Sequence, residues 1–316
     1  MDSTNKGVVA FLLIAFGLAW TLWEIPLQLG LSAGNPLFQL AILPGALAPA
    51  VAAVIVRKWV TREGFEDAGL RLNLHRWRVY LFGWTFPLVA VSAIVLLAMA
   101  LGIGEPDFSL ERALEALTPE GSVAPSVPAG LLAVLPFQLM ISALLVTPLL
   151  WGEEFGWRGY LQLRLLSHRP LLASVVTGII WGLWHLPITL RGYNFPDQPL
   201  IGMLVFMVSA VLLSIIFGWL RVRTGSIWAP SLAHSATNAV GGSLTLLLFI
   251  GGPSWILVSY VGVLGWVPLG ALAAWIVLAG ELDHIRPVLR ANRVTRRQLA
   301  VHTLCKMVEQ GRIPRP

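Results

Sequence analysis

Long apolar segments alternate with short polar ones along most of the chain. Apolar runs begin near residues 8, 37, 78, 129, 171, 200, 226 and 254, and they end near residues 29, 57, 103, 151, 190, 221, 247 and 280. A run of about 20 apolar residues is typical of a helix that crosses the hydrocarbon core of a membrane. The pattern therefore predicts an all-α fold, in which residues 1–281 form an integral membrane domain of eight transmembrane helices.

The amino-acid composition excludes an ordinary soluble fold. Of the 316 residues, 56% are hydrophobic and 12% are charged, and the mean hydropathy is +0.75. Soluble proteins carry about 25% charged residues, so this chain has too little polar surface for a soluble fold of its length. The single cysteine, Cys305, excludes an internal disulfide and a cysteine-rich metal site.

Basic residues are distributed unevenly between the predicted loops. If the N-terminus is cytoplasmic, twenty of the 22 lysines and arginines fall in cytoplasmic segments, and only Arg112 and Arg191 fall outside. Cytoplasmic loops of membrane proteins carry such an excess, and a miscounted span would remove it. We therefore expect a multi-pass protein of the cell membrane with both termini in the cytoplasm. The basic tail, residues 282–316, is interpreted as a segment near anionic lipid headgroups rather than a nucleic-acid-binding arm.

Ionisable residues within the predicted spans concentrate in three places. Each such residue costs about 2.5–3.5 kcal/mol on insertion scales and therefore needs a reason. The three places are WGEEFGWRGY (151–160) at the end of span four, WGLWHLP (181–187) in span five and APSLAHSATNAV (229–240) in span seven. Prolines near all three favour a polar cavity among these spans, since carbonyls freed by proline are tolerated at such cavities. Glu24, near the outer end of span one, is a further candidate whose role the sequence leaves open.

The first of these segments holds two carboxylates in different situations. Glu154 and Arg158 are four residues apart, so they share a helix face and can neutralise each other while bracing the site. Glu153 points about 100° away around the helix axis and has no local partner. This arrangement requires that the helix of Leu131–Leu150 continue unbroken through Arg158, which we predict.

The other two segments each place a histidine on an apolar helix. Trp181 and His185 are four residues apart, as are His234 and Asn238, so each pair shares a helix face. Together with Glu153, these side chains are the parts needed to activate and use water. Glu153 could take a proton from water that His185 holds or shares, while His234 and Asn238 donate hydrogen bonds to the oxyanion of an attacked amide.

A zinc site is an alternative assembly of the same residues. Glu153, His185 and His234 could be three ligands, with water in the fourth position and Glu154 as the base. The usual signature, two histidines four apart on one helix with a glutamate between them, is absent, so local spacing gives zinc no support.

Two further classes of protein remain open on the residues alone. A transporter or channel could use buried acids and histidines as a proton or ion relay. Such proteins often contain inverted repeats, and the sequence shows no internal repeat. A scaffold in which the polar residues only brace the helices is the third class.

The three polar segments resemble the motifs of a known family. EEFGWRGYL resembles the EExxxR motif of the CPBP family, which comprises CAAX prenyl endopeptidases and bacteriocin-processing enzymes and is also called the Abi family. WGLWH is similar to its second motif, an aromatic residue separated by three others from a histidine, with Trp181 where phenylalanine is common. HSATN resembles its third motif, HxxxN. The resemblance covers roughly residues 150–240.

This resemblance implies peptide-bond hydrolysis inside the membrane. Glu153 would be the water-activating carboxylate with His185, and His234 and Asn238 would be the oxyanion donors. The family is described both as metalloproteases and as metal-independent glutamate proteases. Asn238 has a role as an oxyanion donor and none as a zinc ligand, which favours an enzyme that requires no cofactor, with Zn²⁺ as the alternative. The implied partner is a membrane-associated peptide or protein, prenylated or carrying a leader; neither the physiological substrate nor the oligomeric state follows from the sequence.

Overall fold

The protein is helical throughout the part that the structure, a computed structural model, describes. The described residues are 3–31, 37–118, 122–128, 130–165 and 168–282. Within these ranges every regular element is a helix and none is a strand, so the predicted all-α class is confirmed. The basic tail from residue 283, including Cys305, lies outside the described residues.

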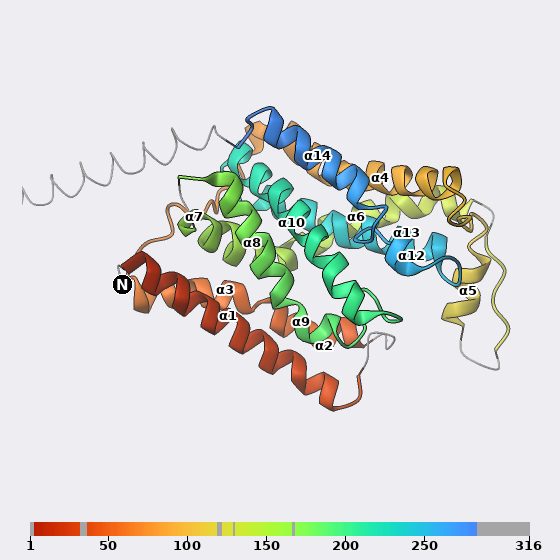
Figure 1. The fold of residues 1–316 in the computed structure, drawn as a ribbon, viewed down its shortest axis with the longest axis horizontal. Helices are drawn as coiled ribbons and strands as arrows, with labels where there is room; N and C mark the ends of the chain where they lie inside the picture. The colour runs from red at the N-terminus through yellow and green to blue at the C-terminus, as the bar shows by residue number, and fades with distance from the viewer. Residues whose placement is uncertain (1–2, 32–36, 119–121, 129, 166–167, 283–316) are drawn as a thin grey trace, which may run out of the picture.

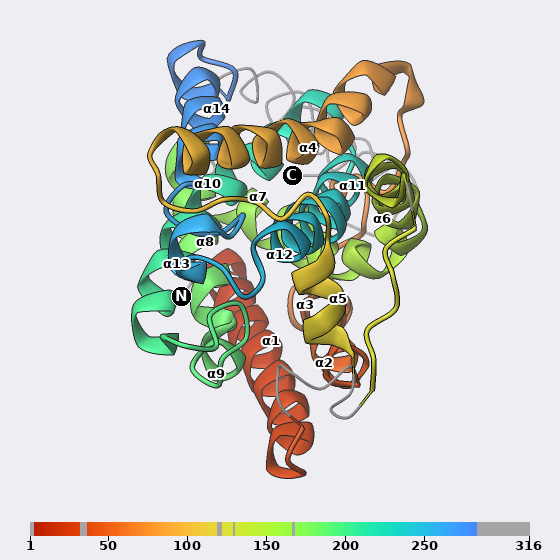
Figure 2. The same cartoon turned by 90° about the vertical axis from the view of Figure 1, so that its right-hand side faces the viewer.

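Among the described residues, five helical segments are long and apolar enough to cross a membrane. They are Thr4–Gln28, Phe38–Val60, Leu74–Ala100, Leu131–Arg164 and Pro199–Thr224. These segments coincide with predicted spans one, two, three, four and six. Figures 1 and 2 show the long helices packed against one another, with α1 at one edge and α14 at the opposite edge. The chain is thus a multi-pass membrane protein.

The elements of the first half lead up to the first polar segment. They are α1 (Ser3–Gln28), α2 (Phe38–Ala46), α3 (Ala48–Ile55), the π-helical turn η1 (Val56–Val60), the 3-10 turn η2 (Leu74–Arg76), α4 (Trp77–Ala100), α5 (Glu111–Leu117) and α6 (Leu131–Gly156).

The elements of the second half carry the two histidine segments. They are the π-helical turn η3 (Trp157–Leu161), α7 (Gln162–Arg164), α8 (Pro170–Trp184), α9 (Leu186–Thr189), α10 (Pro199–Thr224), α11 (Trp228–Ala236), the π-helical turn η4 (Thr237–Gly242), α12 (Ser243–Phe249), α13 (Trp255–Val258) and α14 (Trp266–Leu278).

The remaining three predicted spans are shorter or divided. Span five corresponds to α8, whose 15 residues rise about 22 Å, less than the hydrocarbon thickness of about 30 Å. Span seven is divided into α11, η4 and α12. A helix begins near residue 254 as predicted, since α13 starts at Trp255, but it ends at Val258, so the prediction that it continues through span eight is wrong. A side chain at Gly262 or Gly265 would collide with backbone carbonyls of the turn that follows, and α14 begins at Trp266. The count of eight spans stays a prediction.

Small residues let α6 and α8 approach their neighbours closely. On α6, Gly152 faces Leu47 and Gly156 faces Pro49, at the start of α3. On α8, Gly178 lies against the backbone of α10. Close approach of helix backbones at small residues is a common mode of packing in membranes. At these glycines α6 packs against α3, and α8 packs along α10. α6 also packs against α11.

The helix of span four continues past its apolar part. α6 runs to Gly156, the π-helical turn η3 continues the chain to Leu161, and the helical segment ends at Arg164. The prediction that this helix continues through Arg158 is therefore confirmed. As a consequence, the two glutamates lie within a packed helix and not in an exposed loop.

Candidate active site

The two adjacent glutamates of α6 are both buried, but to different degrees. Glu154 and Arg158 are 0% exposed, whereas Glu153 retains 6%. Glu154 Oε1 accepts a hydrogen bond of 2.9 Å from Arg158 Nη1, so the pair predicted from the spacing is present. The enclosed pair and the partly accessible Glu153 are thus distinct groups.

Glu154 has a second partner that the local spacing did not predict. His234 Nδ1 of α11 lies 2.9 Å from the same oxygen, Oε1. Because the same oxygen already accepts from Arg158, Glu154 is taken as an acceptor and His234 Nδ1 as the atom that carries the hydrogen. His234 Nε2 then has a lone pair in the neutral ring and an N–H only in the imidazolium. His234 can therefore donate a further hydrogen bond only when it is protonated.

The other histidine is held in the opposite electrostatic setting. Pro187 has no N–H to continue the helix, and α8 ends at Trp184. His185 follows, and its Nδ1 lies 2.8 Å from the carbonyl oxygen of Trp181. A carbonyl oxygen can only accept, so His185 Nδ1 donates and Nε2 of the neutral ring has a free lone pair. His185 is therefore suited to accept a hydrogen bond.

Trp181 lies at the centre of these groups. Its Nε1 donates a 3.0 Å hydrogen bond to Glu153 Oε2. Its ring meets both histidine rings edge-on, with centroid distances of 5.6 Å to His185 and 5.2 Å to His234. The Arg158 guanidinium carbon lies 5.0 Å from the centre of the indole ring. Trp181 thus links α6, α8 and α11, whereas the sequence indicated only that it flanks His185. The one available signal was that a buried tryptophan N–H usually finds an acceptor.

Asn238 stands apart from the buried cluster. It belongs to η4, where the winding changes from α to π and hydrogen bonds run from residue i to i+5. Its side chain is exposed, whereas His234 is 4% exposed. The described residues provide no hydrogen bond to the Asn238 side chain. Its role as an oxyanion donor stays a prediction.

Two residues that the sequence did not single out support the cluster. Phe217 of α10 contacts the His234 ring at 5.4 Å and lies 5.2 Å from the Arg158 guanidinium carbon. Arg57 of η1 is 0% exposed, and its Nη2 donates a 2.8 Å hydrogen bond to the Gly159 carbonyl oxygen in η3. No sequence signal distinguished Phe217 from the other twelve phenylalanines. Arg57 counted only as one cytoplasmic positive charge.

Glu24 has a local partner outside the cluster. Its Oε1 accepts hydrogen bonds from Arg191 Nη2 at 2.6 Å and from Gln28 at 2.7 Å. The side chains of Glu24 and Arg191 are 37% and 42% exposed. Glu24 therefore forms a surface ion pair between α1 and the segment after α9.

The predicted zinc ligands are not assembled as a ligand set. In the part of the chain that the structure describes, no group of three or more His, Cys, Asp and Glu side chains is placed so that it could hold a metal ion. The Nδ1 of His234 is directed at Glu154, and one oxygen of Glu153 is directed at Trp181. These residues therefore do not fit a three-ligand zinc site in this arrangement. The metal requirement of the protein stays a prediction to be tested.

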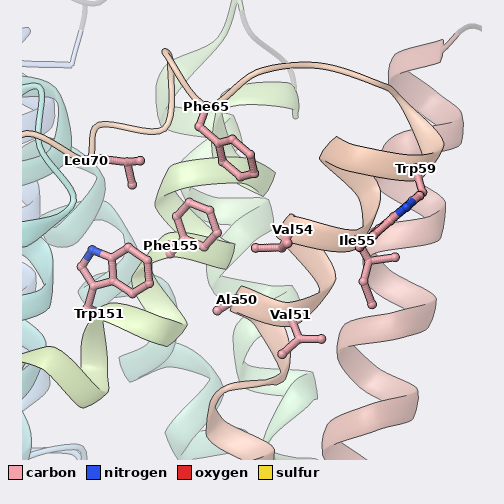
Figure 3. Close-up of a pocket in the computed structure, with 9 residues that line it drawn as sticks. All are labelled: Ala50, Val51, Val54, Ile55, Trp59, Phe65, Leu70, Trp151 and Phe155. Carbon is pink, nitrogen blue, oxygen red and sulfur yellow. The ribbon is translucent and has the colours of Figure 1, made fainter.

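An apolar pocket of about 530 Å³ lies beside the site. Figure 3 shows Trp151 and Phe155 of α6 facing the residues of α3 across it, with Phe65 and Leu70 of the following loop at one end. The Trp151 and Phe155 rings stack with a centroid distance of 4.9 Å. The lining consists of Ala50, Val51, Val54, Ile55, Trp59, Phe65, Leu70, Trp151 and Phe155. Glu153 lies two residues from each of these aromatics, so its side chain points about 160° away from theirs around the axis of α6 and does not line the pocket.

Comparisons with known proteins single out the same region. A family model described as Type II CAAX prenyl endopeptidase Rce1-like matches residues 133–240, which contain all three motifs. CAAX prenyl protease 2 from Methanococcus maripaludis is 28% identical over 223 residues, which cover 67% of this chain and 75% of that protein.

Proposed function

Because the chain belongs to the CPBP family of membrane peptidases, of the CAAX prenyl endopeptidase type, we propose that it hydrolyses a peptide bond of a membrane-associated substrate with water activated by Glu153. The observation that carries this proposal is the hydrogen-bonded cluster of Glu153, Trp181, Glu154 and His234, with His185 in ring contact with Trp181. The relationship to peptidases favours hydrolysis over the ion-coupled transport that the residues alone left open.

In the first step, water attacks the substrate carbonyl carbon. Glu153 Oε2 is engaged by Trp181, so Oε1 is the oxygen that takes the proton from water. The lone pair of His185 Nε2 accepts a hydrogen bond from the other water hydrogen and orients the water. The new C–O bond forms as the C=O π electrons move to the carbonyl oxygen, which becomes an oxyanion. Positioned general bases of this kind contribute about 10²–10⁴-fold to rates.

In the second step, the oxyanion collapses and the C–N bond breaks. His234, as the imidazolium, donates Nε2–H to the oxyanion, and Glu154 stabilises its positive charge through Nδ1. The Asn238 amide is the second donor. Glu153 then returns its proton to the leaving amine nitrogen, so the carboxylate is regenerated and the products are an acid and an amine.

The apolar pocket between α3 and α6 indicates a substrate with an apolar chain. All nine of its lining residues are apolar or aromatic. One relative is named a CAAX prenyl protease, and a branched prenyl chain has the chemistry of this pocket. We propose that such a chain lies between α3 and α6 while the peptide reaches Glu153. A substrate that carries only a leader peptide is the alternative.

The proposed membrane topology has eight spans with both termini in the cytoplasm. It is supported by the excess of lysine and arginine in the loops assigned to the cytoplasm. In this topology spans four, five and seven surround the polar cavity.

The proposed activity is tested with purified protein in detergent and a fluorogenic prenylated peptide. Wild-type protein should cleave it, and Glu153→Gln should lower kcat by at least about 10²-fold without changing the unfolding midpoint. Glu24→Gln, which alters an exposed carboxylate outside the cluster, should retain wild-type cleavage. Undiminished cleavage by Glu153→Gln would remove Glu153 from the mechanism.

The same assay decides the metal requirement. Cleavage is measured after dialysis against a chelator and again after Zn²⁺ is restored. We expect the chelated protein to retain full activity. Loss of cleavage on chelation and its recovery with Zn²⁺ would establish the zinc alternative.

A further inference from the structure

The carboxylate of Glu153 is held by one side chain. Trp181 Nε1 donates to Glu153 Oε2 at 3.0 Å, and within the described residues this is the one hydrogen bond that the carboxylate receives. Trp181 is 3% exposed and Glu153 is 6% exposed. This bond is therefore the directed contact that fixes the orientation of the Glu153 carboxylate.

Trp181 itself is fixed from several sides. The rings of His185 and His234 meet it at 5.6 Å and 5.2 Å, and Phe217 lies at 6.1 Å. Arg158 covers one face of the indole at 5.0 Å. An indole has only two side-chain torsions and loses little conformational entropy when it is packed in this way. Its N–H is thus a rigid donor, directed at one oxygen of Glu153.

The hydrogen bond from Trp181 makes the two oxygens of the Glu153 carboxylate different. Oε2 is occupied by the indole N–H, and Oε1 is left without a hydrogen bond from the described residues. A base that is already oriented does not have to reorganise when the proton moves, which is the advantage of a preorganised site. Loss of the donor would leave Glu153 free to rotate away from the water.

We propose that Trp181 is a positioning residue that acts on the reaction through Glu153, by means of its indole N–H. It orients the carboxylate and does not touch the substrate. This inference rests on the proposed function, since it assigns Trp181 a role in the same hydrolysis. It assigns the N–H, and not only the aromatic ring, a contribution to kcat at position 181 of this chain.

The test removes the N–H and keeps the ring. Trp181 is replaced by benzothienylalanine, a tryptophan analogue with sulfur in place of N–H, and in a second variant by phenylalanine (Trp181→Phe). Both variants should lower kcat about tenfold for the fluorogenic prenylated peptide, which corresponds to about 1.4 kcal/mol. KM should stay within about twofold of the wild-type value, because the substrate contacts are unchanged.

A matched control is available on α10. Trp219 Nε1 also donates to a carboxylate, Glu281 Oε2, at 3.2 Å, and it does not contact the cluster. Benzothienylalanine at position 219 removes the same kind of bond and should leave kcat and KM unchanged. The unfolding midpoints of all variants are measured. If Trp181→Phe proves unstable, the test rests on the sulfur analogue, which preserves the size of the ring.

Each outcome separates this inference from the proposed function. If Glu153→Gln abolishes cleavage but the sulfur analogue at position 181 retains wild-type kcat, the inference is overturned and the proposed function stands. A rise in KM with unchanged kcat would also overturn it, because Trp181 would then act on binding. If wild-type protein cleaves nothing, or Glu153→Gln cleaves normally, both the function and the inference fall.

Discussion

Arg158 carries a charge that is fully enclosed, and its removal should have a large effect on stability. Its side chain and that of Glu154 are both 0% exposed, and they form an ion pair of 2.9 Å. Removing one partner of a buried pair costs about 3–5 kcal/mol, because the remaining charge is left uncompensated. Arg158→Met, which keeps an unbranched side chain and removes the guanidinium with its charge, should therefore lower the free energy of unfolding by an amount in this range.

The contacts of the two residues place the effect near the lower end of that range. Glu154 retains the hydrogen bond from His234 in the variant, so its carboxylate is not left alone. Arg158 makes a single hydrogen bond, since its Nε and Nη2 have no partner in the described residues. Its remaining contacts are with aromatic rings, and those of Trp181 and Phe217 attract it only as a cation. We expect a loss of about 3 kcal/mol.

The measurement is equilibrium unfolding in mixed micelles with increasing dodecyl sulfate, followed by circular dichroism. Arg191→Met is the matched control, since it breaks an exposed ion pair with Glu24 and should cost less than about 1 kcal/mol. The double variant Glu154→Gln/Arg158→Met removes both charges and should lose less stability than the two single variants combined, by about 0.5–3 kcal/mol. Strictly additive losses, or a cost for Arg158→Met no larger than that of the control, would refute the reasoning.

Three further outcomes are expected. Trp151→Ala should raise KM for the prenylated peptide and leave KM for the same peptide without the prenyl group unchanged, because Trp151 lines the apolar pocket; equal effects on both peptides would place the chain elsewhere. Asp67→Asn should lower the free energy of unfolding by about 1–2 kcal/mol in the same micelles, since Asp67 binds Arg57 at 2.8 Å and Arg164 at 3.4 Å. In the loop between α4 and α5, burial acts to raise the pKa of Asp107, but hydrogen bonds from a neighbouring serine and two backbone N–H groups outweigh it and hold the pKa below its usual value. The stability that Asp107 contributes should be present above the unfolded pKa of about 3.9 and lost as pH falls through the lower folded pKa, and Asp107→Asn should remove this acid-dependent part of the unfolding midpoint.

The apolar pattern predicted the long helices well because any apolar run of sufficient length is stable as a helix in the hydrocarbon core. It failed after Val258, where the residues are apolar but the chain turns between α13 and α14. Gly262 and Gly265 permit that turn, since any side chain there would meet a backbone carbonyl. Hydropathy averages over such positions and cannot detect them.

Within the candidate site, contacts inside one helix were predictable and contacts between helices were not. The Glu154–Arg158 pair follows from a spacing of four residues and is present even though η3 is wound as a π helix. The bond between Glu154 and His234 joins residues 80 positions apart, so it depends on how α6 and α11 pack. His234 in α11 is buried, whereas Asn238, four residues later, lies in the π-helical turn η4 and is exposed. A rule based on the α-helical period cannot anticipate this change of winding.

The two histidines look alike in the sequence, and their Nδ1 partners make them chemically different. A carbonyl oxygen accepts from His185, and a neutral acceptor does little to stabilise an imidazolium, so His185 is suited to present its Nε2 lone pair to water. The Glu154 carboxylate accepts from His234 Nδ1, so His234 has an Nε2–H only in the protonated ring. Arg158 balances the charge of Glu154 within the same enclosed group. In the proposed mechanism, protonated His234 donates to the oxyanion, while Glu153, held by Trp181, takes the proton from water. The two carboxylates of EEFGWR thus have different partners, Trp181 for Glu153 and Arg158 with His234 for Glu154, and the proposed mechanism gives them different roles.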